Sequence, residues 1–258
     1  MSNFKNGYFV QDCEKIESLE FLKLKICNLI REEFQIDCSD DDKVLNNFHE
    51  FVNGISDIDL NDKRISLINK INKNIDFKEL IFTSFKNTIL NLLGPDLLVQ
   101  KNCNIVIQRP NDNNPSELHR DAPGNSAYEI VIWIPLVDCY KTKGMYIVDY
   151  ESTCDLYDDL EKNQDWEHFE KKSIKKSSST PVSFGEALFF STAILHGSHI
   201  NQENETRISL NIRFKNIFSP SGLKNQLQFF EKFRVSEFVR IGSNLESKKM
   251  MVQNEQNN

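Results

Sequence analysis

Two residues with metal-binding side chains, His119 and Asp121, lie two positions apart in the sequence. In an extended strand, side chains at positions i and i+2 point to the same face, so both could bind one ion while Arg120 points away. The best candidate for a third ligand is His196, which follows the apolar run Ala187 to Phe190. Two imidazoles and one carboxylate on one side of a metal form a facial ligand set for Fe(II), which leaves the opposite positions open for substrate and dioxygen.

A His-x-Asp triplet is weak evidence by itself, because short motifs of this kind also arise by chance. The chain has five histidines, and an incidental surface pair at His119 and Asp121 is the alternative. The segment that follows His196 strengthens the metal interpretation, because it adds a second group of residues suited to binding a charged ligand.

That segment, Thr206 to Phe214, alternates strictly between polar and apolar residues, which predicts a strand with two different faces. One face carries Arg207, Ser209, Asn211 and Arg213, and the other carries Ile208, Leu210, Ile212 and Phe214. Two arginines with a serine and an asparagine suggest the wall of a polar pocket. An arginine suits such a wall because its planar guanidinium binds a carboxylate through two hydrogen bonds and keeps its charge when partly buried.

Together these segments resemble the Fe(II)/2-oxoglutarate dioxygenases, specifically the phytanoyl-CoA dioxygenase-like branch. Within that branch the chain is similar to small oxygenases of sugar-modifying and surface-polysaccharide gene clusters, which are related to an oxygenase of streptomycin biosynthesis. The matching segments are His119-Arg120-Asp121, His196-Gly197-Ser198-His199-Ile200-Asn201, Arg207, and the ranges 104–110, 133–139, 145–148 and 213–220. The resemblance covers roughly residues 95 to 242. One departure is Glu186, where the family often has Asp, and this position is not a ligand.

The resemblance implies that His119, Asp121 and His196 bind Fe(II) and that 2-oxoglutarate is the cosubstrate. Arg207 would bind its far carboxylate, with Ser198 and Trp133 as further contacts, although Trp133 could equally be a core residue. The implied products are succinate and carbon dioxide. Because related halogenases lack the carboxylate ligand, Asp121 favours hydroxylation or another oxidation over halogenation.

The substrate is less defined by the sequence. Arg213, Gln108 and Tyr128 are candidates for contacts to it, and the resemblance alone implies a sugar or a sugar-derived metabolite. Two other functions remain open, namely a metal-binding jelly roll with isomerase-like or epimerase-like sugar chemistry, and a non-catalytic binding module. Arg207 discriminates between them and the oxygenase, because neither alternative requires it.

The length of 258 residues, of which 39% are hydrophobic and 27% charged, predicts one domain with one sizeable core. Periodic apolar residues predict helices over about 12–93, and short alternating or apolar runs predict strands from Leu97 onward. The resemblance implies a double-stranded β-helix, or jelly roll. We therefore expect a helical cover packed on one sheet over 1–94, a jelly-roll core over 95–218, a packing segment over 219–242 and a disordered tail over 243–258.

Composition also limits partners and location. The net charge of -7 argues against nucleic acid as a partner. The sequence lacks a long apolar run and a signal-peptide pattern, which predicts a cytoplasmic protein without membrane insertion. The six scattered cysteines predict reduced thiols. The polar segment 153–179 is expected to be a loop, either a lid over the pocket or a solvated excursion with a short helix.

Overall fold

The computed structural model describes residues 4–223 and 226–256. The elements in chain order are β1 (Tyr8–Asp12), α1 (Ile16–Phe34), α2 (Asp41–Asn46), α3 (Phe48–Phe51), α4 (Asp57–Asn74), α5 (Phe77–Ser84), α6 (Lys86–Leu93), β2 (Leu97–Gln100), β3 (Asn104–Gln108), β4 (Glu129–Pro135), η1 (Lys141–Lys143), β5 (Met145–Ile147), α7 (Tyr150–Asn163), α8 (Trp166–Lys176), β6 (Ser178–Thr180), β7 (Glu186–Ser191), β8 (His196–Gly197), β9 (Arg207–Asn216), α9 (Gln226–Phe229), β10 (Phe230–Arg234) and α10 (Glu237–Gln256).

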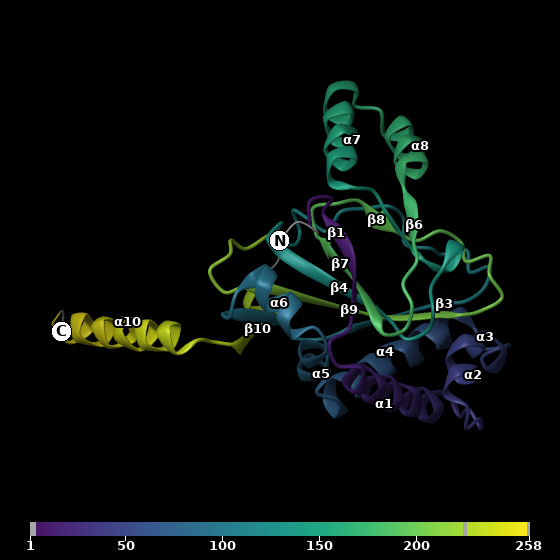
Figure 1. Cartoon of the computed structure of the whole chain (residues 1–258), viewed down its shortest axis with the longest axis horizontal. Helices are drawn as coiled ribbons and strands as arrows, with labels where there is room; N and C mark the ends of the chain where they lie inside the picture. Colours follow the sequence, from purple (N-terminus) through teal and green to yellow (C-terminus); the bar gives the residue numbers. More distant parts are fainter. Residues whose placement is uncertain (1–3, 224–225, 257–258) are drawn as a thin grey trace.

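The strands form two antiparallel sheets. The larger has seven strands in the order β1-β7-β4-β9-β2-β10, with β3 also paired to β9. The smaller has three strands in the order β6-β5-β8. Because β4 lies between β7 and β9, each of its residues is buried, as its nearly continuous apolar sequence predicted. The structure is therefore a mixture of helices and antiparallel strands, in which the strands form the middle of the molecule (Figure 1).

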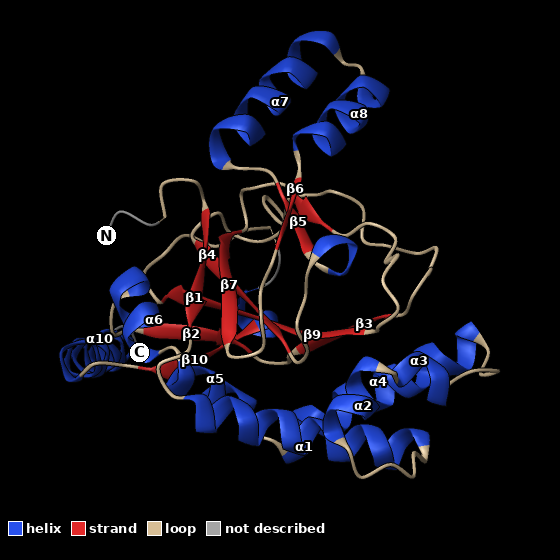
Figure 2. Ribbon diagram, turned by 45° about the vertical axis from the view of Figure 1, so that its right-hand side comes forward, coloured by secondary structure: helices blue, strands red, loops and turns tan. Residues whose placement is uncertain are grey.

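The two faces of β9 have different surroundings, as the alternating sequence predicted. Ile208, Leu210, Ile212 and Phe214 are fully buried and belong to the main hydrophobic core, together with buried residues of α1, α4 and α5. Figure 2 shows α1 to α5 together on one side of the large sheet, away from β5 and β6. The polar side chains of β9 consequently point away from these helices.

The N-terminal helices begin where the sequence supplies capping groups. The Asp40 side chain accepts a hydrogen bond from the backbone N–H of Lys43 at the start of α2, and Ser56 and Asp76 do the same for α4 and α5. The last part of the predicted helical region forms two short helices, α5 and α6, which are separated at Phe85. Phe85 is fully buried and packs edge-on against Phe189 of β7, so the break brings an aromatic ring into the core.

The segment 153–179 is not a loop, because it lies mostly in the two helices α7 and α8, so the alternative with a short helix is the nearer one. Both begin with an aspartate cap, in which Asp149 accepts from the N–H of Ser152 and Asp165 from that of His168. Leu156, Leu160 and Phe169 form a small second core with Val148 and Leu195. Figure 1 shows the pair beyond the small sheet, at the opposite end of the molecule from α1 to α4.

The C-terminal region also differs from the expectation. The packing segment contains β10, which extends the large sheet by pairing with β2. The tail expected to be disordered from residue 243 is helical up to Gln256, as part of α10, and residues 257–258 lie outside the described residues. Figure 1 shows α10 extending away from the rest of the molecule. Within the described chain no helix combines the length and apolar character needed to cross a membrane.

Candidate metal centre

The three predicted ligands lie together although His196 is far from the other two in the sequence. One ligand atom from each of His119, Asp121 and His196 lies within 4.8 Å of the other two. The Nε2 atoms of His119 and His196 are each 3.9 Å from an oxygen of Asp121. Side chains of this kind at this spacing can bind one metal ion between them.

A short backbone pairing brings the two histidines together. His119 and His196 form an isolated antiparallel bridge, in which the N–H of each donates to the carbonyl oxygen of the other at 2.9 Å. Gly197 permits this close approach, because a Cβ atom there would lie 2.7 Å from the carbonyl oxygen of Ser116 and 2.8 Å from that of Glu117. The glycine after His196 is therefore required by backbone packing.

Hydrogen bonds orient both imidazoles. His119 Nδ1 lies 2.7 Å from the carbonyl oxygen of Glu117, and His196 Nδ1 lies 3.0 Å from that of Ile194. A carbonyl oxygen only accepts, so each Nδ1 carries the proton and each Nε2 has a free lone pair directed at the site. The Phe190 ring, 4.6 Å from the His196 ring, packs against the buried ligand, whereas the His119 side chain is 47% exposed. The site is thus closed on one side and open on the other.

Arg213 binds the carboxylate ligand. Its guanidinium donates to Asp121 Oδ2 at 2.5 Å and to Gln100 Oε1 at 3.3 Å. Burial raises the pKa of Asp121, but the positive charge of Arg213 and its hydrogen bond outweigh this, so its pKa is below the ordinary value. The sequence predicts Arg213 as a contact to the substrate, and the structure in addition pairs it with Asp121, one of the three predicted ligands. Gln100, on β2, is a site residue that no sequence pattern indicated.

Replacing Arg213 should weaken metal binding. We expect Arg213→Ala to lower the affinity about 10- to 100-fold, as is typical when an outer partner of a ligand is removed, because Asp121 loses the group that orients it. Titration with Co(II), followed by its visible absorption, measures the effect. Arg109→Ala is the matched control, since Arg109 pairs with the exposed Asp57 away from the site. An unchanged Co(II) affinity in Arg213→Ala would contradict this role.

Burial lowers the pKa of His196 to about 4, although Asp121 opposes the shift. In metal-free protein the unfolded chain then binds a proton at this imidazole below pH 6.5, while the folded chain does so only near pH 4. Stability should therefore fall as the pH decreases through this window, by about 3 kcal/mol from this group. Urea unfolding of chelator-treated protein at pH 6.5 and pH 4.5 tests this, and His196→Gln should show a smaller loss. Equal losses in both proteins would assign the effect to other groups.

A row of buried polar atoms without partners follows the polar face of β9. Strand pairing places Gln108 opposite Arg207 and Trp133 opposite Asn211 on this face. Among the described residues, the buried side-chain atoms with no hydrogen-bond partner include Gln108 Oε1, Arg207 Nε, Ser209 Oγ, Asn211 Oδ1 and Arg213 Nε. Buried polar groups of natural proteins are nearly always paired, so such a row indicates that a polar ligand binds along β9.

Arg207 is the most unusual member of this row. The residue is 3% exposed, and its guanidinium donates to the carbonyl oxygen of Gly144 at 3.1 Å and lies 6.0 Å from the ring of the fully buried Trp133. Burial lowers its pKa from the ordinary value. No carboxylate forms an ion pair with it in the described part of the chain. A buried guanidinium without a counter-ion favours the binding of an anion.

The other predicted contact residues have three different surroundings. The Gln108 amide donates to the carbonyl oxygen of His199 at 2.6 Å. Ser198 is buried, and its hydroxyl accepts from the N–H of Ser116 at 3.0 Å, so it holds the strand that carries His119. Tyr128 is 61% exposed and lies at the surface. Of these candidates for ligand contact, only Gln108 is placed on the polar face of the sheet beside β9.

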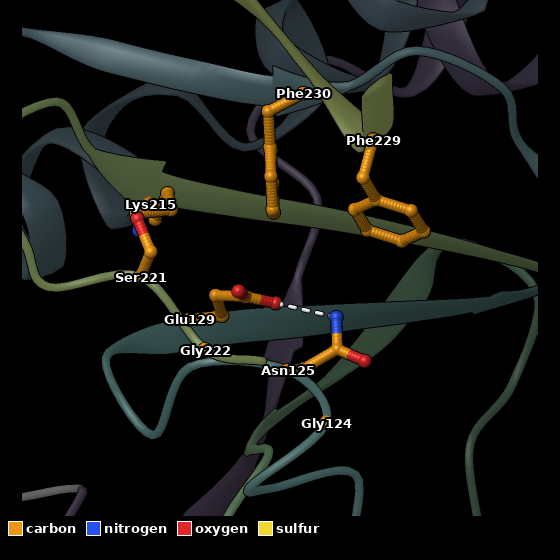
Figure 3. A pocket seen from close by; sticks show the side chains of 8 residues that line it. All are labelled: Gly124, Asn125, Glu129, Lys215, Ser221, Gly222, Phe229 and Phe230. Atoms are coloured by element: carbon orange, nitrogen blue, oxygen red, sulfur yellow. Dashed lines mark hydrogen bonds between the residues drawn. The ribbon is translucent and has the colours of Figure 1, made fainter. Parts of the chain in front are cut away.

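A second polar cluster lies at the ends of β4 and β9, around a cavity of about 10 Å³ that has room for roughly one water molecule (Figure 3). Asn125 lies in the loop after Asp121 and donates to the buried Glu129 at 2.8 Å. Lys215 donates to the carbonyl oxygen of Pro220. These contacts anchor the loop after Asp121. The carboxylate at the start of the apolar run of β4 was the sequence signal for them.

No protein-family model matches this chain, and no curated protein matches it either. Solved structures do match. The nickel complex of the non-haem monooxygenase ThoJ has a TM-score of 0.54 at 15% identity, with 99% of this chain and 96% of that chain covered. SnoK, a non-haem α-ketoglutarate-dependent carbocyclase from nogalamycin biosynthesis, has a TM-score of 0.56 at 15% identity, with 91% of each chain covered.

The iron-bound structure of EctD from S. alaskensis matches with a TM-score of 0.52 at 12% identity, with 91% of this chain and 85% of that chain covered. The matches extend over nearly the whole of this chain, from the N-terminal helices to the C-terminal region. The chain therefore has the fold of non-haem oxygenases, which include enzymes that use α-ketoglutarate.

Proposed function

We propose that this protein is an Fe(II)/2-oxoglutarate-dependent oxygenase. The observation that carries the proposal is the convergence of His119, Asp121 and His196 within 4.8 Å of one another. Two neutral imidazoles and one ionised carboxylate are the ligand set of mononuclear non-haem iron sites. The fold shared with a nickel-bound monooxygenase and an iron-bound protein supports this identification.

The donor set and the buried polar row fit the two implied groups. His119 and His196 direct Nε2 at the site because their Nδ1 atoms are hydrogen-bonded to carbonyl oxygens. Arg207 lacks a carboxylate partner within the described residues, which suits the far carboxylate of 2-oxoglutarate. Ser209 Oγ and Asn211 Oδ1, also buried and unpaired in the described chain, are further groups that a polar cosubstrate can satisfy.

Fe(II) with 2-oxoglutarate and dioxygen supplies the oxidation of a C–H bond, with release of succinate and carbon dioxide. The chain's own residues bind and orient. Arg213 keeps Asp121 ionised and holds one of its oxygens, which leaves the other for the metal. Trp133 and Phe190, both fully buried, form apolar walls that exclude water beside Arg207 and His196.

We propose hydroxylation as the outcome, because Asp121 retains a carboxylate where halogenases need space for halide. The substrate is a small molecule, and the resemblance of the sequence favours a sugar or a sugar-derived metabolite converted in the cytoplasm, as in carbohydrate biosynthesis. We interpret the two sheets as the halves of a double-stranded β-helix within one domain that reaches residue 242, with 1–94 as its helical cover.

Anaerobic addition of Fe(II) and then 2-oxoglutarate tests the proposal. We expect a weak visible metal-to-ligand charge-transfer band that requires both additions. Asp121→Asn, which keeps the shape of the side chain and removes its charge, should reduce the band. A protein that binds Fe(II) without developing the band on addition of 2-oxoglutarate would contradict the proposal. Substrate-dependent succinate release from a panel of sugars then tests the substrate class.

A further inference from the structure

A second cavity lies between α8 and the two segments that carry the predicted ligands His119 and His196. Its volume is about 260 Å³, enough for a small organic molecule, and Leu118 and Ser198 contribute to its lining. Leu118 directly precedes the ligand His119, and Ser198 follows the ligand His196 by two residues. The Arg120 guanidinium lies 3.8 Å from the centroid of the Tyr157 ring, which connects α7 to the segment that carries His119. The cavity itself is enclosed partly by α8.

Two carboxylates line this cavity, Glu117 and Glu170, and no lysine or arginine does so within the described residues. Neither carboxylate forms an ion pair in the described chain, whereas the neighbouring Glu167 on α8 pairs with Lys171 at 2.5 Å. The lining therefore carries two negative charges without counter-ions. A cavity of this charge favours a cationic ligand.

A buried hydroxyl provides an independent sign of a ligand. Ser173 lines the cavity and is 1% exposed, and its Oγ has no hydrogen-bond partner among the residues that the structure describes. A ligand that exchanges a hydrogen bond with this hydroxyl would satisfy it, and a donor attracted by the two carboxylates is one such ligand. Beside it, Leu118, Phe169 and Ile174 supply an apolar surface. The combination fits a molecule with an apolar part and a donor group of positive charge.

We propose that the cavity binds an amine-bearing part of the substrate, so that the oxygenase acts on a small organic ammonium compound. This inference rests on the proposed function, because only a metal centre that oxidises C–H bonds makes the neighbouring cavity a substrate site. Glu117 and Glu170 bind the ammonium group, and Ser173 Oγ accepts one of its hydrogen bonds. The apolar side chains pack against the carbon skeleton and direct it toward the metal ligands. An amino sugar is one member of this class.

Benzylamine and its neutral analogue benzyl alcohol are the probes, titrated into full-length metal-free protein and followed by NMR. We expect benzylamine to bind about tenfold more tightly than the alcohol, because its ammonium forms charge-assisted hydrogen bonds with the carboxylates. The double variant Glu117→Gln/Glu170→Gln should abolish this preference and leave the affinity for the alcohol unchanged. Ser173→Ala should weaken benzylamine about threefold, the typical effect of one lost hydrogen bond.

Glu167→Gln is the matched control, since Glu167 lies on the same helix outside the lining and should leave both affinities unchanged. Thermal unfolding of each variant confirms that it is folded. Equal binding of the amine and the alcohol, or an unchanged preference in the double variant, overturns the inference.

The binding measurement needs neither iron nor 2-oxoglutarate, so it fails independently of the proposed function. If the charge-transfer band forms and the amine preference is absent, the oxygenase proposal stands and the inference falls. If benzylamine binds selectively but no band forms, the cavity is an amine site without a neighbouring oxidation centre, and its assignment to a substrate is overturned.

Discussion

Replacement of His196 by alanine should abolish metal binding in the affinity range of the unaltered protein and, with it, all oxygenase activity. The imidazole is one of three ligand groups and is buried, with its Nε2 3.9 Å from Asp121. Its removal leaves only two ligand groups, Asp121 and the exposed His119. We expect a loss of at least about 100-fold in Fe(II) or Co(II) affinity, since changes even to the partners of ligands cost 10- to 100-fold. Calorimetric titration with Co(II) measures it.

The matched control is His199→Ala. His199 is the nearest other imidazole in the sequence, and its ring packs edge-on against Tyr146 with a centroid distance of 3.8 Å. It is not part of the ligand group, so its loss should leave metal affinity within about twofold of the unaltered protein. Retained metal binding in His196→Ala, or an equal loss in both variants, would remove His196 from the ligand set.

Replacement of Arg207 by alanine should weaken 2-oxoglutarate binding about 10- to 100-fold, which corresponds to a charge-assisted hydrogen bond of roughly 1.5–3 kcal/mol. The buried guanidinium has one backbone acceptor and no carboxylate partner within the described chain, so an incoming carboxylate gains its full interaction. The 2-oxoglutarate dependence of the charge-transfer band gives the affinity. The same ligand should also raise the melting temperature of the unaltered protein more than that of the variant.

Arg64→Ala is the control for this experiment. The Arg64 guanidinium also donates to a backbone carbonyl, that of Ile105 on β3, but it lies outside the polar row of β9. Its loss should leave the 2-oxoglutarate affinity unchanged. If Arg207→Ala binds 2-oxoglutarate as tightly as the unaltered protein does, another residue binds the far carboxylate, with Arg213 the first to test.

The strands of the core were predictable because the order of polar and apolar residues within each one indicates which of its faces are buried. The alternation in β9 separates the apolar Ile208 and Leu210 from the polar Arg207 and Ser209, and the structure places the two sets on opposite faces, both of them buried. The convergence of His119 with His196 was not a local property. It depends on one isolated bridge between segments far apart in the sequence, for which only the recognised motif gave an indication.

The errors lie where local composition conflicts with packing. The helices α7 and α8 are rich in charged and polar residues, and few apolar positions, such as Leu156 and Phe169, reveal their buried side. Their aspartate caps, Asp149 and Asp165, were the signals that could have identified them. For Arg213, the alternation of its strand predicts only which face of the sheet it occupies. Its hydrogen bond to Asp121 depends on the tertiary structure, which that local pattern does not report.

The reciprocal backbone hydrogen bonds between His119 and His196 have a consequence for which ions the protein accepts. Main-chain bonds of 2.9 Å in both directions set the spacing of the two backbone segments, and the carbonyl oxygen that each Nδ1 contacts holds its ring in place. The two Nε2 atoms are therefore held by backbone contacts on both sides of the site. We expect ions close to Fe(II) in their ligand preference, such as Co(II) and Ni(II), to bind here. Calcium, which prefers oxygen ligands and forms longer bonds, should bind poorly to a site that offers two imidazole nitrogens.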